Sequence, residues 1–405
     1  MGSRIPLYKK VWRIFLKGFY SVERSILKNK KKLNIYKWIV TKLPIKNNKV
    51  LVSNYFGHGY GDNPKCIVDE LIHQGKDIKI IWLINDGTFD FPKEVTPVNK
   101  YSLRAYYESA TAKAWVSNIR IGHLTEKRKK QIYLQTNHGF LSVKKVEAEA
   151  EEKLNTRYLS QAKKDGAWTD GIIVESGWRE QLMRKAFWLK EDCDYLRIGS
   201  PKVDEFLSLL KPDNIKRIKE EMGLPSDAYI VLYAPTFRNK TSNRGYITDF
   251  NAVINAFFTR HKKVIMLLRF HPNTINDKDS LFETISEGFL DVTKYPDVQE
   301  ILAVADCIIS DYSSMPFVFS MSNKPVFIYA SDFKDYCSER GVNDLFWIQP
   351  FPVCYNIEEL INAIKKYNEE EWKEKRREFY INYPMYNNGE AATNAVKWLY
   401  KKGLK

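Results

Sequence analysis

A chain of 405 residues with 44% hydrophobic and 14% aromatic residues is long enough for two domains and too apolar to be disordered. Its five cysteines are scattered without a C-x-x-C pair, which argues against a disulfide framework and a structural zinc site and is typical of a reducing compartment. The formal net charge is +15, but residues 1–50 hold 14 Lys or Arg and one acid, so this segment carries +13 and the remaining 355 residues carry +2.

The basic segment has the pattern of an amphipathic helix. Apolar and basic side chains fall on opposite sides of a 3.6-residue helix, with Tyr8, Trp12, Phe15, Leu16, Phe19 and Ile26 on one side and Lys10, Arg13, Lys17, Arg24 and Lys28 on the other. No stretch reaches about 18 uncharged apolar residues, so none spans a bilayer, and Arg13 and Lys17 interrupt the apolar core of any signal peptide. We expect residues 1–48 to lie on an anionic membrane surface. The alternative is a helix packed on the body with a solvated basic rim. Nucleic acid is disfavoured as a partner because the body lacks a basic patch.

From about residue 49 onward the pattern is α/β. Strands are predicted at 49–53, 78–84, 114–116, 131–134 and 171–174, and helices at 63–75, 101–112 and 145–164. Short apolar strands that alternate with helices predict a parallel sheet covered on both faces.

The alternation breaks near residues 200–226 and then resumes. Gly199-Ser200-Pro201 is a loop, 203–222 is helical and 223–227 is a turn, after which strands are predicted at 229–233, 263–268, 307–309 and 326–329. We therefore predict an α/β fold of two Rossmann-like, doubly wound domains, at 49–205 and 206–385, followed by a C-terminal helix within 386–405. Ligands of such sheets bind beyond the carboxyl ends of the strands, which places the expected site between the two domains.

Four predicted strands run into polar residues at their carboxyl ends. They are followed by Gln135 to Gly139, by Ala234 to Arg238, by Arg269 to Asn273 and by Ser310 to Ser314. The last of these turns has two interpretations. Asp and Ser are preferred helix caps, but a polar turn before a helix also presents backbone N–H groups that bind anions.

Two of the six histidines, His138 and His271, stand at such strand ends in opposite halves, near Arg238, Arg269 and Ser313. A neutral imidazole is a suitable general base for an alcohol near pH 7, and arginines, hydroxyls and helix N–H groups suit a diphosphate. The P-loop, G-x-G-x-x-G, H-E-x-x-H and G-x-S-x-G motifs do not occur. No carboxylate cluster suits Mg²⁺, so we expect neither a protein-bound metal nor another cofactor.

Several motifs occur in a fixed order between about residues 130 and 345. They are Tyr233-Ala-Pro-Thr-Phe-Arg238, Arg269-Phe-His-Pro272, Tyr295-Pro-Asp297, Asp306-Cys-Ile-Ile-Ser-Asp-Tyr-Ser-Ser314 and Lys324-Pro325. Together they resemble the CDP-glycerol glycerophosphotransferase family of teichoic acid and capsule synthesis. Their common order and spacing make the match specific, although each motif alone is weak.

The resemblance implies a GT-B-like fold, with the acceptor bound by the N-terminal half and the cytidine diphosphate donor by the C-terminal half. It implies that His138 deprotonates the acceptor hydroxyl and that His271 contacts the donor phosphates. The further implied donor ligands are Arg238, Arg269, Asp311, Ser313, Ser314, Asn388 and Gly389, and Asn137 and Gly139 stand on the acceptor side.

The chain departs from the family pattern at three places. Asn137 and Phe140 flank the His-Gly pair where the family commonly has Trp and Thr, and Asn388 replaces an Asp. The stretch after Arg340-Gly341 lacks the acidic Pro-Gly-Pro segment that is usual in the family. These departures leave the acceptor and the polyol open.

The implied activity is transfer of glycerol phosphate or ribitol phosphate from CDP-glycerol or CDP-ribitol to a lipid-linked glycan or polyol-phosphate acceptor, with release of CMP. The implied location is the cytoplasmic face of the bacterial cell membrane, as a peripheral protein. A GT-B nucleotide-sugar glycosyltransferase of cell-surface polysaccharide synthesis is the alternative enzyme. A catalytically silent membrane scaffold is the alternative outside enzymes.

Overall fold

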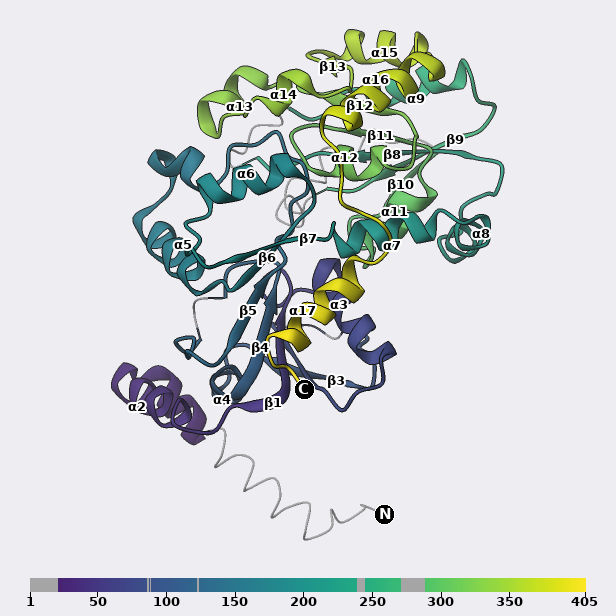
Figure 1. Ribbon diagram of the computed structural model, residues 1–405. Helices are drawn as coiled ribbons and strands as arrows, with labels where there is room; N and C mark the ends of the chain where they lie inside the picture. The colour runs from purple at the N-terminus through teal and green to yellow at the C-terminus, as the bar shows by residue number, and fades with distance from the viewer. Residues whose placement is uncertain (1–20, 86, 88, 122–123, 239–244, 271–287) are drawn as a thin grey trace, which may run out of the picture.

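The computed structural model describes residues 21–85, 87, 89–121, 124–238, 245–270 and 288–405. It contains two parallel sheets, one in each half of the chain, with helices on both faces (Figure 1). The predicted α/β, GT-B-like fold of two doubly wound halves is thereby confirmed.

The N-terminal sheet has seven strands in the order β3-β2-β1-β4-β5-β6-β7, and every neighbouring pair is parallel. Its strands are β1 (Lys46–Ser53), β2 (Lys79–Ile84), β3 (Val95–Asn99), β4 (Ala112–Ser117), β5 (Ile132–Gln135), β6 (Gly171–Val174) and β7 (Asp194–Arg197). The central strands are short, uninterrupted apolar runs because both faces of the sheet are covered.

Different helices cover the two faces of this sheet. The first core contains Val50 and Val52 of β1 with side chains of α3 (Asp62–His73) and of the C-terminal helix α17 (Ala391–Lys401). On the other face, Leu51 and Trp115 pack with α4 (Leu103–Thr111). The remaining helices of this half are α2 (Lys30–Val40), the 3₁₀ helix η1 (Glu147–Lys153), α5 (Thr156–Trp168) and α6 (Gly177–Ala186).

The C-terminal sheet has six parallel strands in the order β10-β9-β8-β11-β12-β13. Its strands are β8 (Tyr229–Ala234), β9 (Val264–Leu268), β10 (Phe289–Asp291), β11 (Cys307–Ser310), β12 (Val326–Tyr329) and β13 (Val353–Cys354). The helices of this half are α7 (Pro201–Leu209), α8 (Pro212–Glu221), α9 (Phe250–Phe258), α11 (Val298–Val304), α12 (Met315–Ser320), α13 (Phe333–Glu339), α14 (Leu345–Ile348), α15 (Ile357–Lys365) and α16 (Glu369–Asn382).

The two halves meet at several places, of which three involve whole segments of the chain. The first is α7, which packs on α3 and on α11. The second is a bridge between Lys144 and Val342, beside which the Asn343 side-chain amide donates to the Ser142 carbonyl at 2.8 Å. The third is the segment after α16, which returns to the N-terminal half and ends in α17 against α3 (Figure 1). The 342–343 stretch, which departs from the family pattern, thus contributes to the contact between the halves.

Two predicted helices are interrupted in the structure. The predicted helix at 145–164 is wrong as one element, because η1 and α5 are separated at Asn155, whose side chain accepts from the Tyr158 amide at 2.8 Å and caps α5. The predicted helix at 203–222 divides into α7 and α8 at Pro212, which occupies the first turn of α8. Strands β3, β7, β10 and β13 have no counterpart in the sequence prediction because they lie toward the sheet edges and are short or partly exposed.

Most of the predicted amphipathic helix, up to residue 20, lies outside the described residues. Residues 21–28 are helical, and α2 packs on α4, where the Tyr36 hydroxyl donates to the Leu103 carbonyl at 3.1 Å. Among the residues described, no helix is long and apolar enough to cross a membrane.

Candidate active site

His138 stands in a tight turn directly after β5. Asn137 has a φ of +52°, and its side-chain oxygen accepts from the amides of His138 and Gly139, both at 2.7 Å. A Cβ at position 139 would lie 2.8 Å from a guanidinium nitrogen of Arg179, so a larger residue there would require the Arg179 side chain to move. Asn137, expected on the acceptor side, is buried and shapes this turn.

The hydrogen bond at Nδ1 selects the tautomer of the His138 ring. Nδ1 lies 3.0 Å from the backbone carbonyl oxygen of Asn118. Because a carbonyl can only accept, Nδ1 carries the proton and Nε2 keeps its lone pair. The ring is reached by solvent yet surrounded by protein, and this desolvation lowers its pKa despite the opposing effects of the Asn118 hydrogen bond and the Asp62 carboxylate. The neutral form therefore prevails near pH 7.

Lys202 contacts both the His138 turn and the Asp62 carboxylate. Its ammonium group donates to the His138 carbonyl at 2.6 Å and pairs with Asp62 at 2.8 Å. Burial acts to raise the pKa of Asp62, but the charge and hydrogen bond of Lys202 outweigh it, so the pKa is lowered. Asp62 also accepts from the Tyr55 hydroxyl at 2.9 Å. Tyr55, Phe56, Asp62 and Asn137 all have positive φ angles, a concentration of backbone strain that is typical of functional sites.

A cavity of about 620 Å³ opens beside His138. Its lining combines Phe56, Tyr101, Phe187 and Leu189 with the polar side chains of Arg120, Glu147, Tyr158 and Asp165. Arg120 and Glu147 form an ion pair at 2.8 Å, and burial raises the pKa of Asp165 to about 6. Aromatic walls with a few polar groups suit a polyhydroxylated ligand.

A buried acid–base pair lies behind Gly139. Glu175 follows β6 and is 3.8 Å from Arg179, and both side chains are nearly inaccessible. Neither Glu175 oxygen has a hydrogen-bond partner in the described part of the protein, nor do two of the Arg179 nitrogens. Burial raises the pKa of Glu175 to about 7, although Arg179 opposes the shift.

In the C-terminal half, Arg238 forms ion pairs with two carboxylates. It donates to Asp311 at 2.8 Å and to Asp332 at 2.5 Å, and Asp311 also accepts from the Thr236 amide at 3.0 Å. The structure thus brings the predicted residues Arg238 and Asp311 together as an internal ion pair. In this arrangement they fix the turn that follows β11.

The turn at 313–314 begins α12. The Ser313 hydroxyl, one residue before the N-cap, accepts from the Met315 amide at 3.1 Å. Ser314 is the N-cap position, and its side chain makes no cap bond. Lys144 approaches from the N-terminal half. Burial lowers its pKa to about 8, and it interacts electrostatically with Asp311, Arg340 and Arg238.

The other residues predicted to bind the donor lie in two separate parts of the chain. Arg269 donates to the carbonyls of Val292 and Tyr295 and lies close enough to Tyr55 for an electrostatic interaction across the two halves. His271 lies outside the described residues. Asn388 and Gly389 are exposed on the segment that returns to the N-terminal half, and no described contact joins them to the 311–314 turn. No group of three or more His, Cys, Asp or Glu side chains that could hold a metal occurs in the described regions.

Sequence reasoning missed Asp62, Lys144, Glu175, Arg179 and Lys202. None of them belongs to a motif that was recognised, and their relation to His138 or Asp311 arises from contacts between distant segments. Lys202, for example, is 64 residues from the carbonyl that it binds. The one local signal was the Gly199-Ser200-Pro201 loop that precedes it.

Fold and site together define a two-domain α/β enzyme of GT-B-like architecture. The chain is similar to a solved structure of the wall teichoic acid polymerase TagF, which superposes with a TM-score of 0.81 at 24% identity over 96% of this chain and 97% of that one, a likeness that establishes the fold. Residues 35–401 match the model of the CDP-Glycerol:Poly(glycerophosphate) glycerophosphotransferase family, and the chain belongs to that family.

Two similar relatives cover nearly the whole chain. A teichoic acid glycerol-phosphate transferase of Staphylococcus aureus is 28% identical over 90% of this chain and 95% of its own length. A teichoic acid poly(glycerol phosphate) polymerase of Bacillus spizizenii is 27% identical over 89% and 94%. The protein is therefore a glycerophosphotransferase-like enzyme of the teichoic acid polymerase family, as the motifs indicated.

Proposed function

We propose that this protein transfers a polyol phosphate from a CDP-activated donor to a hydroxyl of a lipid-linked acceptor at the cytoplasmic face of the membrane, in teichoic acid or capsule synthesis. The acceptor oxygen attacks the β-phosphorus of the donor, the bond between that phosphorus and the bridging oxygen breaks, and CMP leaves. Glycerol phosphate is favoured over ribitol phosphate, because a ribitol-phosphate polymerase of Bacillus spizizenii matches only 43% of this chain whereas the glycerol-phosphate relatives match about 90%.

One observation carries the proposal: the Asn118 carbonyl fixes the proton of His138 on Nδ1 at the mouth of a cavity suited to a polyhydroxylated ligand. Nε2 is then the atom that accepts the proton of the attacking hydroxyl. Asn137 and Gly139 set the turn that presents the ring, and the Arg120, Glu147 and Tyr158 side chains orient the acceptor. General-base catalysis and positioning are the contributions expected from this half.

On the donor side, Lys144, Ser313 and Ser314 are the groups that meet the diphosphate. The Arg238–Asp311 pair holds their turn in place, and Arg269 supplies positive charge from β9. His271, Asn388 and Gly389 remain donor ligands by family resemblance. Fixed positive charge next to the diphosphate stabilises the charge that develops on CMP as it leaves.

The test is CMP release from CDP-glycerol, CDP-ribitol and nucleotide sugars, each with a lipid-linked disaccharide acceptor. We expect release from CDP-glycerol that requires acceptor, is lost in His138→Ala and persists in His73→Ala, whose imidazole is exposed on α3. Release from a nucleotide sugar alone would instead identify a glycosyltransferase. A His138→Ala protein that retains full release would remove the proposed base.

A further inference from the structure

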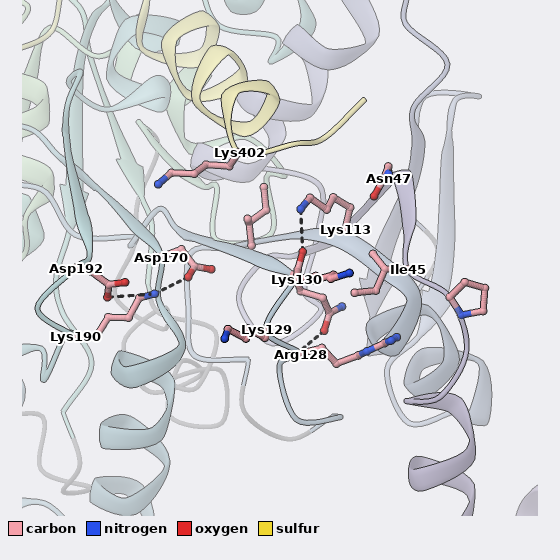
Figure 2. Close-up of a pocket in the computed structure, with 13 residues that line it drawn as sticks. Ile45, Asn47, Lys113, Arg128, Lys129, Lys130, Asp170, Lys190, Asp192 and Lys402 are labelled. Carbon is pink, nitrogen blue, oxygen red and sulfur yellow. Dashed lines mark hydrogen bonds and ion pairs between the residues drawn. The ribbon is translucent and has the colours of Figure 1, made fainter.

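Figure 2 shows a second cavity, of about 680 Å³. It lies at the amino-terminal edge of the N-terminal sheet, at the opposite end of the strands from His138. Its walls come from the turn before β1, the starts of β4 and β5, the loop after α6 and the turn after α17. Its cationic side chains are Lys113, Arg128, Lys129, Lys130, Lys190 and Lys402. We call it the basic pocket.

The positive charge of the basic pocket is poorly compensated. Asp170 and Asp192 are the carboxylates in its lining, and both pair with Lys190, at 2.7 and 3.4 Å. Lys402 pairs with Asp194 at 2.8 Å. The guanidinium of Arg128 and the ammonium of Lys113 donate to backbone carbonyls instead, and a carbonyl does not neutralise a charge.

Lys129 and Lys130, both exposed, carry two further charges of the basic pocket. Within the described residues, the ammonium groups of Lys129 and Lys130 make no hydrogen bond or ion pair. Lys113, Arg128, Lys129 and Lys130 form no ion pair within the described residues, so their charges repel one another unless an anion enters. Burial lowers the pKa of Lys113, although the Asp170 carboxylate opposes the shift. The pocket is therefore suited to a multiply charged anion, for which lysines are common ligands.

The residues next to the basic pocket indicate the source of that anion. Arg128 donates to the carbonyl of Leu43, in the turn that joins α2 to β1. On α2, Ile35, Trp38 and Ile39 are 52%, 63% and 48% exposed, and Lys30 and Lys31 lie beside them. Exposed apolar side chains flanked by lysines are typical of a helix in a membrane interface, and basic pockets next to a membrane bind lipid head groups.

Two pairs of adjacent residues are divided between the basic pocket and the cavity at His138. Thr169 and Leu189 line the cavity at His138, whereas the residues that follow them, Asp170 and Lys190, line the basic pocket. The segments 169–170 and 189–190 thus link the two cavities along the chain.

We propose that the basic pocket binds the phosphate group of a membrane lipid. Two lipids carry this chemistry: an anionic phospholipid, and the diphosphate of the lipid-linked acceptor. The second possibility rests on the function proposed above, because it makes the pocket the anchor point of the acceptor.

The test uses the full chain and a variant, Lys129→Gln/Lys130→Gln, that removes the two unpartnered charges. Short-chain phosphatidate and inorganic diphosphate are titrated by calorimetry with excess CMP present to occupy the donor site. We expect the variant to bind both about 30-fold more weakly. Lys365→Gln/Lys366→Gln, an adjacent exposed pair at the end of α15, is the matched control and should bind as wild type does.

A second control separates the pocket from general attraction to a surface. Lys30→Gln/Lys31→Gln on α2 should weaken sedimentation with phosphatidylglycerol vesicles but leave titration by diphosphate unchanged. Stronger binding of diphosphate than of phosphatidate would identify the acceptor anchor, and the reverse order would identify a phospholipid. If the wild type binds neither probe, or if the pocket variant binds both as well as wild type, the proposal is wrong.

CMP release by the wild-type protein is measured separately, so that the two proposals can fail independently. Transfer without binding in the pocket would overturn this inference and leave the proposed function intact. Binding in the pocket without transfer would do the opposite.

Discussion

Nδ1 of His138 lies 3.0 Å from the backbone carbonyl oxygen of Asn118, across 20 residues of sequence. This single contact decides which ring nitrogen can act as a base. Asn118 is itself held in place, since its side chain donates to the Asn54 side chain at 2.7 Å and accepts from the Tyr55 amide at 3.0 Å. The end of β4 thus orients the group that follows β5.

The lowered pKa of His138 predicts the pH dependence of transfer. The base is active when neutral, so kcat/KM should fall as the pH drops through a pKa below the ordinary value of 6.5. His138→Ala should lose about 10²- to 10⁴-fold in kcat and should lack this acid limb. The pH profile of CMP release measures both effects. An acid limb that survives in His138→Ala would assign it to another group.

Lys202 is predicted to be a positioning residue. Lys202→Met leaves the buried Asp62 carboxylate without its cation, which should lower the free energy of unfolding by about 3–5 kcal/mol. Because the His138 carbonyl loses its donor, kcat should fall more than KM rises. Lys202→Arg keeps the charge and should restore most of the stability. Denaturant unfolding and steady-state kinetics are the measurements, and an unchanged kcat in folded Lys202→Met would contradict the role.

Lys144 is predicted to bind the donor phosphates from the opposite half. Lys144→Met should reduce kcat/KM for CDP-glycerol by about 10- to 100-fold through loss of a charge-assisted hydrogen bond. Lys145→Met is the matched control because Lys145 is the adjacent, exposed lysine. Equal effects of the two substitutions would indicate a general loss of charge rather than a specific ligand.

Glu175 is predicted to make stability depend on pH. Its pKa is about 7 in the folded protein and has an ordinary value of 4.5. Between these values the folded state holds a proton that the unfolded state has released, so the free energy of unfolding should decrease by about 3 kcal/mol as the pH rises from about 4.5 to about 7. Glu175→Gln should flatten this slope, whereas Glu370→Gln, at an exposed site on α16, should not. Asp165, whose pKa is raised from 3.8 to about 6, contributes a slope of the same sign between about pH 3.8 and 6 that persists in both variants.

The sequence by itself determined the fold class, the central strands and the family. Continuous apolar runs of four to six residues indicate buried parallel strands. The polar motifs that follow these strands indicate the edge of each sheet at which the active site is expected. Edge strands and helix interruptions escaped detection because short, half-exposed segments have no clear period and because Asn155 and Pro212 interrupt otherwise helical patterns.

Only the tertiary structure decided how the site is assembled. It turned Asn137 inward to hold the His138 turn and paired Arg238 with Asp311. It also placed Asp62 and Lys202 at the His138 turn and Lys144 near Asp311. The six cations of the basic pocket likewise come from separate segments of the chain. These relationships depend on contacts between segments far apart in the chain. Local sequence patterns report periodicity and turn chemistry, whereas the distances between charges follow from how the sheets and helices pack.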